Sequence, residues 1–223
     1  MPDSVKESRV DNAYERLKQE ILSNRMPAGF QATEPEIALM LGMSRTPVRE
    51  ALIRLEADGL VQIIPRRGVR VLPIRLEDMR EIYQILTALE PEAAASIAAS
   101  KPSRETLEPL YVATEDMARA IEDGDREAWA RADDRFHRDL IGLNANKRLN
   151  SMVMTLFDQA HRARMFTLPL RDMPVRSTQD HREILDEMLA GNSATVRKMF
   201  HSHRTCAAEE LLTILDKFRQ TQF

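Results

Sequence analysis

Histidine and aspartate side chains in the second part of the chain have the spacing of metal ligands. Asp133 and His137 are four residues apart, which makes them neighbours on one face of a helix. Trp129, Phe136 and Leu140 flank this pair at core spacing, so the face is expected to point inward. Imidazole nitrogens and a carboxylate suit a divalent transition metal. The pattern indicates either part of a metal site or a pair that stabilises its own helix.

All five histidines lie in this part of the chain, and the apolar phase of each helix predicts which ones face inward. His181 and His203 each have the helical spacing of the apolar residues around them, so both are expected on the inward face of their helix. His201 lies about 200° around the helix from His203 and is expected in solvent, while His161 is ambiguous. The predicted ligands are Asp133, His137, His181 and His203. Zinc is the first expectation, with nickel, manganese or iron as alternatives; the competing interpretation is a set of hydrogen-bonded core histidines.

Helices must position these side chains, because residues from 76 onward are amphipathic and contain few glycines. Turn residues such as Asp123-Gly124 and Gly191-Asn192 separate the helical segments. The expected helices are 76–99, 104–122, 125–143, 147–167, 175–190 and 193–218. The sequence therefore predicts an all-α antiparallel helical bundle in this part of a mostly α chain.

A second group of residues has the chemistry of nucleic-acid binding. Residues 44–55 read SRTPVREALIRL, with Ser44 expected to cap a helix and Pro47 in its first turn. Arg45 and Arg49 fall outside the apolar stripe of this helix. A short cationic helix fits the major groove of DNA, where an arginine fork can bind guanine or a phosphate.

The segments around this helix predict a winged helix-turn-helix. Thr33 and Glu36 have the spacing of a capping box, and Gly42 allows a tight turn between two helices. Downstream, two strands at 60–64 and 69–72 are joined by a turn that carries two arginines. A basic hairpin beside a recognition helix can contact the adjacent phosphates or minor groove. The polar first dozen residues are expected to be frayed.

Residues 10–73, through "LGMSRTPVREALIRLEADGLV" and "RRGVRV", resemble the winged helix-turn-helix of GntR-type bacterial transcription regulators. This resemblance implies that operator DNA is contacted by Arg45, Thr46, Arg49, Arg67 and Gly68. Arg54 is a weaker candidate, since it can equally pair with Glu50 or Asp58 on its own helix.

The helical part resembles the FadR-type C-terminal domain, called FCD, in its metal-bearing branch. "DDRFH" matches the D-x-x-F-H motif of that domain, "DHREI" is similar to its E-H-x-x-I segment, and His203 matches the histidine of its last helix. The resemblance implies the same four ligands, with Asp134 as an outward neighbour. Members that bind small carboxylates commonly carry an arginine where this chain has Leu86. Arg162 or Arg164 could replace it, the metal could hold the ligand directly, or the effector could be less acidic.

Composition is consistent with two domains, 1–74 for DNA binding and 75–223 for effector binding and dimerisation. Residues 1–75 hold twelve Lys/Arg against ten Asp/Glu, a net charge of +2, whereas the remainder carries −5. The lone Cys206 excludes an intrachain disulfide and is expected to be at least half-buried. The absence of a long apolar run predicts no signal peptide and no membrane span, hence a cytoplasmic location.

These features together predict a homodimeric transcription regulator, a repressor in preference to an activator, rather than an enzyme. Two DNA-binding domains would read a short inverted repeat of double-stranded operator DNA. A small-molecule effector, with organic acids among the candidates, would bind beside the metal; its binding residues are unknown. A direct metal sensor is the first alternative. A metal-dependent hydrolase is the weaker one, because all-helical phosphohydrolases usually show a His-Asp doublet that this chain lacks.

Overall fold

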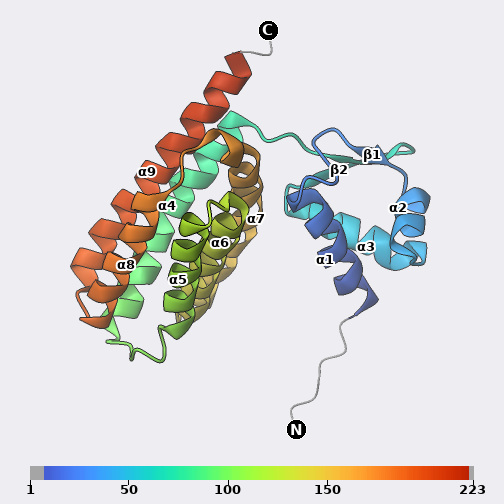
Figure 1. Ribbon diagram of the computed structural model, residues 1–223. Coiled ribbons are helices and arrows are strands. Elements are labelled where there is room, and N and C mark those ends of the chain that lie inside the picture. The colour runs from blue at the N-terminus through green and yellow to red at the C-terminus, as the bar shows by residue number, and fades with distance from the viewer. Residues whose placement is uncertain (1–7, 221–223) are drawn as a thin grey trace. The chain divides into compact units, whose positions relative to one another are not determined.

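The computed structural model describes residues 8–220, which divide into two compact units between Ile74 and Arg75 (Figure 1). Unit 1 combines short helices with a small sheet, and unit 2 consists of packed helices. This arrangement confirms the mostly α fold class and the winged helix-turn-helix with a helical bundle. Within residues 8–220, no helix is both long enough and apolar enough to cross a bilayer.

Unit 1 packs its helices around one apolar core. Its helices are α1 (Arg9–Leu22), α2 (Glu34–Leu41) and α3 (Arg45–Ala57), and its strands are β1 (Gln31–Ala32), β2 (Val61–Ile64) and β3 (Gly68–Val71). Leu17 of α1 and Val48 and Leu55 of α3 are buried at the centre of this core. The apolar stripe of α3 therefore faces inward and leaves the opposite face of the helix to solvent.

The start and end signals of these helices behave largely as predicted. Thr33 and Glu36 form the capping box, and Gly42 ends α2 in the left-handed conformation with a φ of 65°. Ser44 is the N-cap residue of α3, but its side chain makes no capping hydrogen bond, contrary to expectation. Helix α1 begins at Arg9 with Ser8 as its side-chain cap, so the expected fraying is wrong for residues 9–12. Residues 1–7 lie outside the described part.

The sheet of unit 1 contains a third strand, β1, that the sequence did not reveal. The sheet order is β1-β3-β2, all antiparallel, and β1 pairs Ala32 with Val69. Gly68 at the start of β3 has a φ of +89°, and a Cβ there would lie 2.1 Å from the carbonyl oxygen of Ala32. The wing can therefore approach β1 this closely only with glycine at position 68.

Unit 2 is the predicted bundle. Its elements are α4 (Leu76–Ala99), α5 (Glu108–Glu122), α6 (Arg126–Leu143), α7 (Lys147–Thr167), the short 3₁₀ helix η1 (Leu168–Leu170), α8 (Val175–Leu189) and α9 (Ser193–Gln220). The helix expected at 104–122 begins later, at Glu108, and the other boundaries lie within two residues of prediction. Helix α9 runs along α4, and α5 lies beside α6 (Figure 1).

Candidate functional site

Three histidines from three helices of unit 2 meet in its interior. His137 on α6, His181 on α8 and His203 on α9 are all buried. Each can offer a ring nitrogen such that these atoms lie within 4.8 Å of one another. The Nε2 atoms of His181 and His203 are 3.1 Å apart. Phe136 stacks on the His181 ring with centroids 4.1 Å apart, which fixes the ring in the core.

Asp133 completes the predicted donor set. Its Oδ1 lies 3.6 Å from His137 Nε2 and 4.0 Å from His181 Nε2. With metal–nitrogen bonds of about 2.0–2.1 Å, tetrahedral ligand atoms lie roughly 3.3 Å from one another. The Nε2 atom of His137 is buried and has no hydrogen-bond partner among the described residues. A buried nitrogen without a partner, beside a carboxylate and two further histidines, fits a divalent metal ion.

Glu90 is a member of this site that sequence reasoning missed. It is fully buried on α4, and its Oε2 lies 2.9 Å from Nδ1 of His137. Its other oxygen forms an ion pair with the buried Arg204 of α9. A carboxylate on the far nitrogen of a histidine fixes its tautomer and turns Nε2 toward the metal position. An acidic residue on the inward face of α4 was the available signal.

The electrostatics of the site favour the protonation state that metal binding needs. Burial alone would raise the pKa of Asp133, but His137 and Arg164 outweigh it and hold this pKa well below its usual range. Burial and the neighbouring histidines lower the pKa of His181 and of His203. An ionised Asp133 beside neutral His181 and His203 supplies three ligands in the form that binds a metal.

Asp134, next in sequence, belongs to a network of basic residues that Arg164 links to Asp133. It accepts hydrogen bonds from Arg138 at 2.6 Å and from Arg164 at 2.8 Å, and His161 Nδ1 lies 3.3 Å away. Asp134 therefore faces away from the three histidines, as expected of a non-ligand, although it is half-buried rather than outward. His161, ambiguous from sequence, joins this network, whereas His201 is exposed as predicted.

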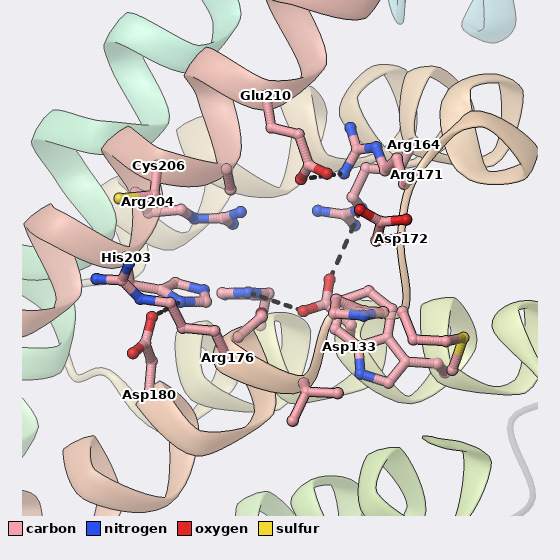
Figure 2. Close-up of a pocket in the computed structure, with 17 residues that line it drawn as sticks. Asp133, Arg164, Arg171, Asp172, Arg176, Asp180, His203, Arg204, Cys206 and Glu210 are labelled. Carbon is pink, nitrogen blue, oxygen red and sulfur yellow. Dashed lines mark hydrogen bonds and ion pairs between the residues drawn. The ribbon is translucent and has the colours of Figure 1, made fainter. Parts of the chain in front are cut away.

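A pocket of about 230 Å³ opens beside these ligands (Figure 2). Asp133, His137 and His203 line it, together with arginines from several elements: Arg164, Arg171, Arg176 and Arg204. Among the described residues, Arg164 lines this pocket, whereas Leu86 and Arg162 do not. Cys206 also lines it and is exposed, which corrects the expectation that this thiol is at least half-buried.

Unit 1 presents its predicted DNA-contacting residues on one accessible face. Arg45, Thr46 and Arg49 are exposed on α3, and Arg67 is exposed in the wing turn. A hollow of about 490 Å³ separates α3 from the wing, with Arg45, Arg49 and Gly68 in its lining. The face is thus a cationic groove between a helix and a hairpin, with the chemistry of a nucleic-acid interface.

Arg54 lies in a different environment from the other arginines of α3. It donates to Asp11 of α1 at 2.7 Å, and its guanidinium stacks over the Tyr14 ring at 4.2 Å. The partner is neither of the two acids expected from its own helix. An arginine engaged between α1 and α3 must give up these contacts before it can bind a phosphate.

Comparisons with known proteins agree with this architecture. Residues 9–71 match the model of bacterial regulatory proteins of the gntR family, and residues 81–205 match that of the FCD domain. An uncharacterized HTH-type transcriptional regulator from the TAR-I ttuE-ttuC' intergenic region of Agrobacterium vitis is 44% identical over 146 residues, which cover 64% of this chain and 85% of the relative. The HTH-type transcriptional repressor RspR of Escherichia coli is 33% identical over 125 residues, 56% of this chain and 54% of that protein.

The fold is also that of a solved structure, E. coli McbR/YncC. It superposes with a TM-score of 0.80 at 21% identity and covers 92% of this chain and 98% of its own. At this identity the likeness concerns the fold alone.

Proposed function

Because the chain belongs to the GntR family of bacterial regulatory proteins and carries an FCD domain, we propose that it is a homodimeric repressor controlled by a metabolite bound at a metal site. The family and the matched relatives are DNA-binding transcription regulators, not enzymes, which excludes the hydrolase alternative. The relative RspR is named a repressor, which supports the proposed sign of regulation.

One observation carries the regulatory part of the proposal. Donor atoms of His137, His181, His203 and Asp133 converge, buried, at the wall of a pocket that is large enough for a small metabolite. A metal held there by these four side chains, zinc first among the candidates, would accept an acidic ligand by expanding its coordination beyond four. The surrounding side chains would orient the ligands and attract the effector. Glu90 would hold the ring of His137, and the arginines that line the pocket would attract a negatively charged effector.

Two copies of unit 1 in a dimer would read the two halves of a short inverted repeat. In this proposal Arg45, Thr46 and Arg49 of α3 contact base edges and phosphates in the major groove, and the wing turn with Arg67 and Gly68 approaches the adjacent backbone or minor groove. Arg54 is the least suited of the proposed contacts, given its pairing with Asp11.

The effector can change operator affinity only through a difference in its affinity for the DNA-competent and DNA-incompetent forms of the dimer. The pocket favours this interpretation over direct metal sensing, because a pure metal sensor needs no cavity beside its ligands. Direct sensing would instead give DNA binding that is graded by metal alone.

The test compares wild type with the double variant His181→Ala/His203→Ala and with His201→Ala, which changes an exposed histidine on the same helix as His203. Metal content is measured by mass spectrometry on untagged protein, and DNA affinity is measured on an operator selected from a randomised pool. We expect about one equivalent of metal in wild type and His201→Ala and none in the double variant.

Acidic metabolites should shift the operator affinity of the two metal-loaded proteins and leave the double variant unchanged. Absence of metal from all three proteins would reduce the histidines to a core cluster. Operator binding that follows added metal with no organic ligand would replace this proposal with direct metal sensing.

A further inference from the structure

Arg171 lines the pocket, and one hydrogen-bonding edge of its guanidinium is used by no described side chain. It follows η1 and is nine-tenths buried, with 10% side-chain exposure. Its Nη1 lies 3.5 Å from Glu210, whereas Nε and Nη2 are buried and have no hydrogen-bond partner among residues 8–220. These two nitrogens form one edge of the planar guanidinium, the edge that binds a carboxylate or phosphate through two parallel hydrogen bonds.

Arg164 adds a second buried donor in the same pocket. Its side chain is 6% exposed, and its Nη2 donates to Asp134. Its Nη1 has no hydrogen-bond partner in the described chain, and its Nε lies 3.8 Å from Asp133. Figure 2 shows the guanidinium of Arg164 directed toward the middle of the pocket, with Asp133 facing it. Arginines this deeply buried normally have all their donors satisfied.

The first turn of α8 lines this pocket as well, through Pro174, Val175, Arg176 and Ser177. Within the described residues, no side chain caps this end of the helix. Backbone N–H groups at an uncapped helix N-terminus favour a bound anion. The positive end of α8 and the donors of Arg171 thus both favour a bound anion.

The acidic residues of the pocket leave the Nε and Nη2 edge of Arg171 unpaired, because Glu210 contacts only its Nη1. Glu210 and Asp172 are exposed, and Asp180 lies 3.3 Å from His203 Nδ1. Asp133 lies beside His137, His181 and Arg164. The free edge of Arg171 is therefore left for an acid group that the protein itself does not supply.

We infer that the pocket holds a small dianion, with one acid group at the proposed metal site and the second on the free edge of Arg171. Arg164 Nη1 and the α8 N-terminus assist at the second subsite. The inference rests on the proposed function, because the first acid group needs the metal. The second group is a carboxylate or a phosphate-type group, since both accept two hydrogen bonds from one arginine edge.

The test measures binding to zinc-loaded full-length protein by calorimetry. The probes are succinate, 3-phosphonopropionate and butyrate, three acids of similar length of which butyrate has a single acid group. The variants are Arg171→Gln, Arg171→Lys and Arg182→Gln; Arg182 is an exposed residue of α8 outside the pocket lining, so it controls for net charge. Zinc content is measured again after each titration, because diacids can remove metal.

We expect wild type to bind at least one diacid roughly ten-fold or more tighter than butyrate. Arg171→Gln should weaken that diacid by about 10- to 100-fold and leave butyrate unchanged, and Arg171→Lys should recover only part of the loss. Arg182→Gln should match wild type. Preference for succinate or for 3-phosphonopropionate identifies the second acid group.

Equal affinities of wild type for butyrate and the diacids would overturn the inference and leave the metal-anchored effector standing. The same result follows if Arg171→Gln and Arg182→Gln behave alike, or if diacids bind only by removing zinc. A protein that binds zinc but none of the acids overturns both this inference and the acidic effector. Absence of zinc binding would contradict the proposed function itself.

Discussion

The Nε2 atoms of His181 and His203 face each other at 3.1 Å, although the residues are 22 positions apart and lie on different helices. Two imidazole nitrogens at this distance either share one proton or share one cation. Burial, the neighbouring histidines and Arg204 lower the pKa of both rings, and Asp133 does not offset them. The interior is therefore arranged to keep both rings neutral, which is the form that binds a metal.

The metal-free protein should become less stable as the pH falls from 7.5 to 5.5. Burial lowers the pKa of His181 and His203 below the value of 6.5 expected in the unfolded chain. Below that value the unfolded chain binds protons that the native state does not, so lower pH favours unfolding. The loss should be about 1 kcal/mol per histidine at one pH unit below this value.

Urea midpoints of EDTA-treated protein at the two pH values test this prediction. The carboxylates of Asp133 and Glu90, whose pKa values are lowered, contribute their stability above the usual carboxyl range and lose it only at lower pH. The change in stability between pH 7.5 and pH 5.5 is therefore attributed to the histidines and not to these carboxylates. Midpoints that do not move across this interval contradict the prediction.

Glu90→Gln should weaken metal binding by about 10- to 100-fold, because an amide no longer supports the imidazole of His137 as a carboxylate does. The matched control is Glu92→Gln, which removes an exposed acid two residues further along α4 that pairs with Arg197. Competition with a chromophoric chelator gives the affinities, and circular dichroism checks that both variants fold. Equal affinities in the two variants would show that Glu90 does not orient His137.

Arg45→Ala and Arg49→Ala should each abolish specific operator binding and leave the fold and metal content intact, since both side chains are exposed and lie in the groove of α3. Loss of a bidentate base contact costs about 1–3 kcal/mol, roughly 5- to 150-fold in affinity, so protection should disappear at protein concentrations that just saturate the operator with wild type. Arg25→Ala, which removes an exposed arginine paired with Glu20 outside that groove, is the control. Footprinting that still shows protection by both groove variants would disprove the assignment of α3 as the recognition helix.

Gly68→Ala should destabilise unit 1 by more than about 2 kcal/mol, because the positive φ of this residue is combined with a clash between the new Cβ and the backbone of Ala32. Gly29→Ala separates the two effects: Gly29 has a similar φ of +82°, but a Cβ there meets no described atom within 4 Å. We expect a cost of only about 1–2 kcal/mol at Gly29. Thermal unfolding and DNA binding of both variants are the measurements; matching values would refute a role for close packing of β1 on the wing.

Local patterns were sufficient to predict most of the fold. The helices of unit 2 alternate apolar and polar residues at helical spacing, and turn residues such as Gly124 and Gly191 adopt positive φ where the helices end. Strand β1 was not predicted because it has only two residues, too few for any periodicity to be visible. It exists because β3 is available to pair with it, which is a tertiary effect.

The donor set of the site follows from helical phase, but the contacts that support it do not. Glu90 lies 47 positions from His137, and Arg204 lies 114 positions from Glu90. Their contacts arise where α4, α6 and α9 pack together, so no spacing along the chain reveals them. Arg171 stands in the segment between η1 and α8, where the sequence has no period from which an inward direction could be inferred.

The buried ion pair between Glu90 and Arg204 also has an evolutionary consequence. Loss of either charge alone would leave the other unpaired in the interior, which typically costs about 3–5 kcal/mol. A single substitution at either position is therefore a step that selection rejects, whereas a paired replacement by apolar residues is tolerated. Among relatives of this chain, the two positions should covary: those that lack the acid should lack the arginine as well.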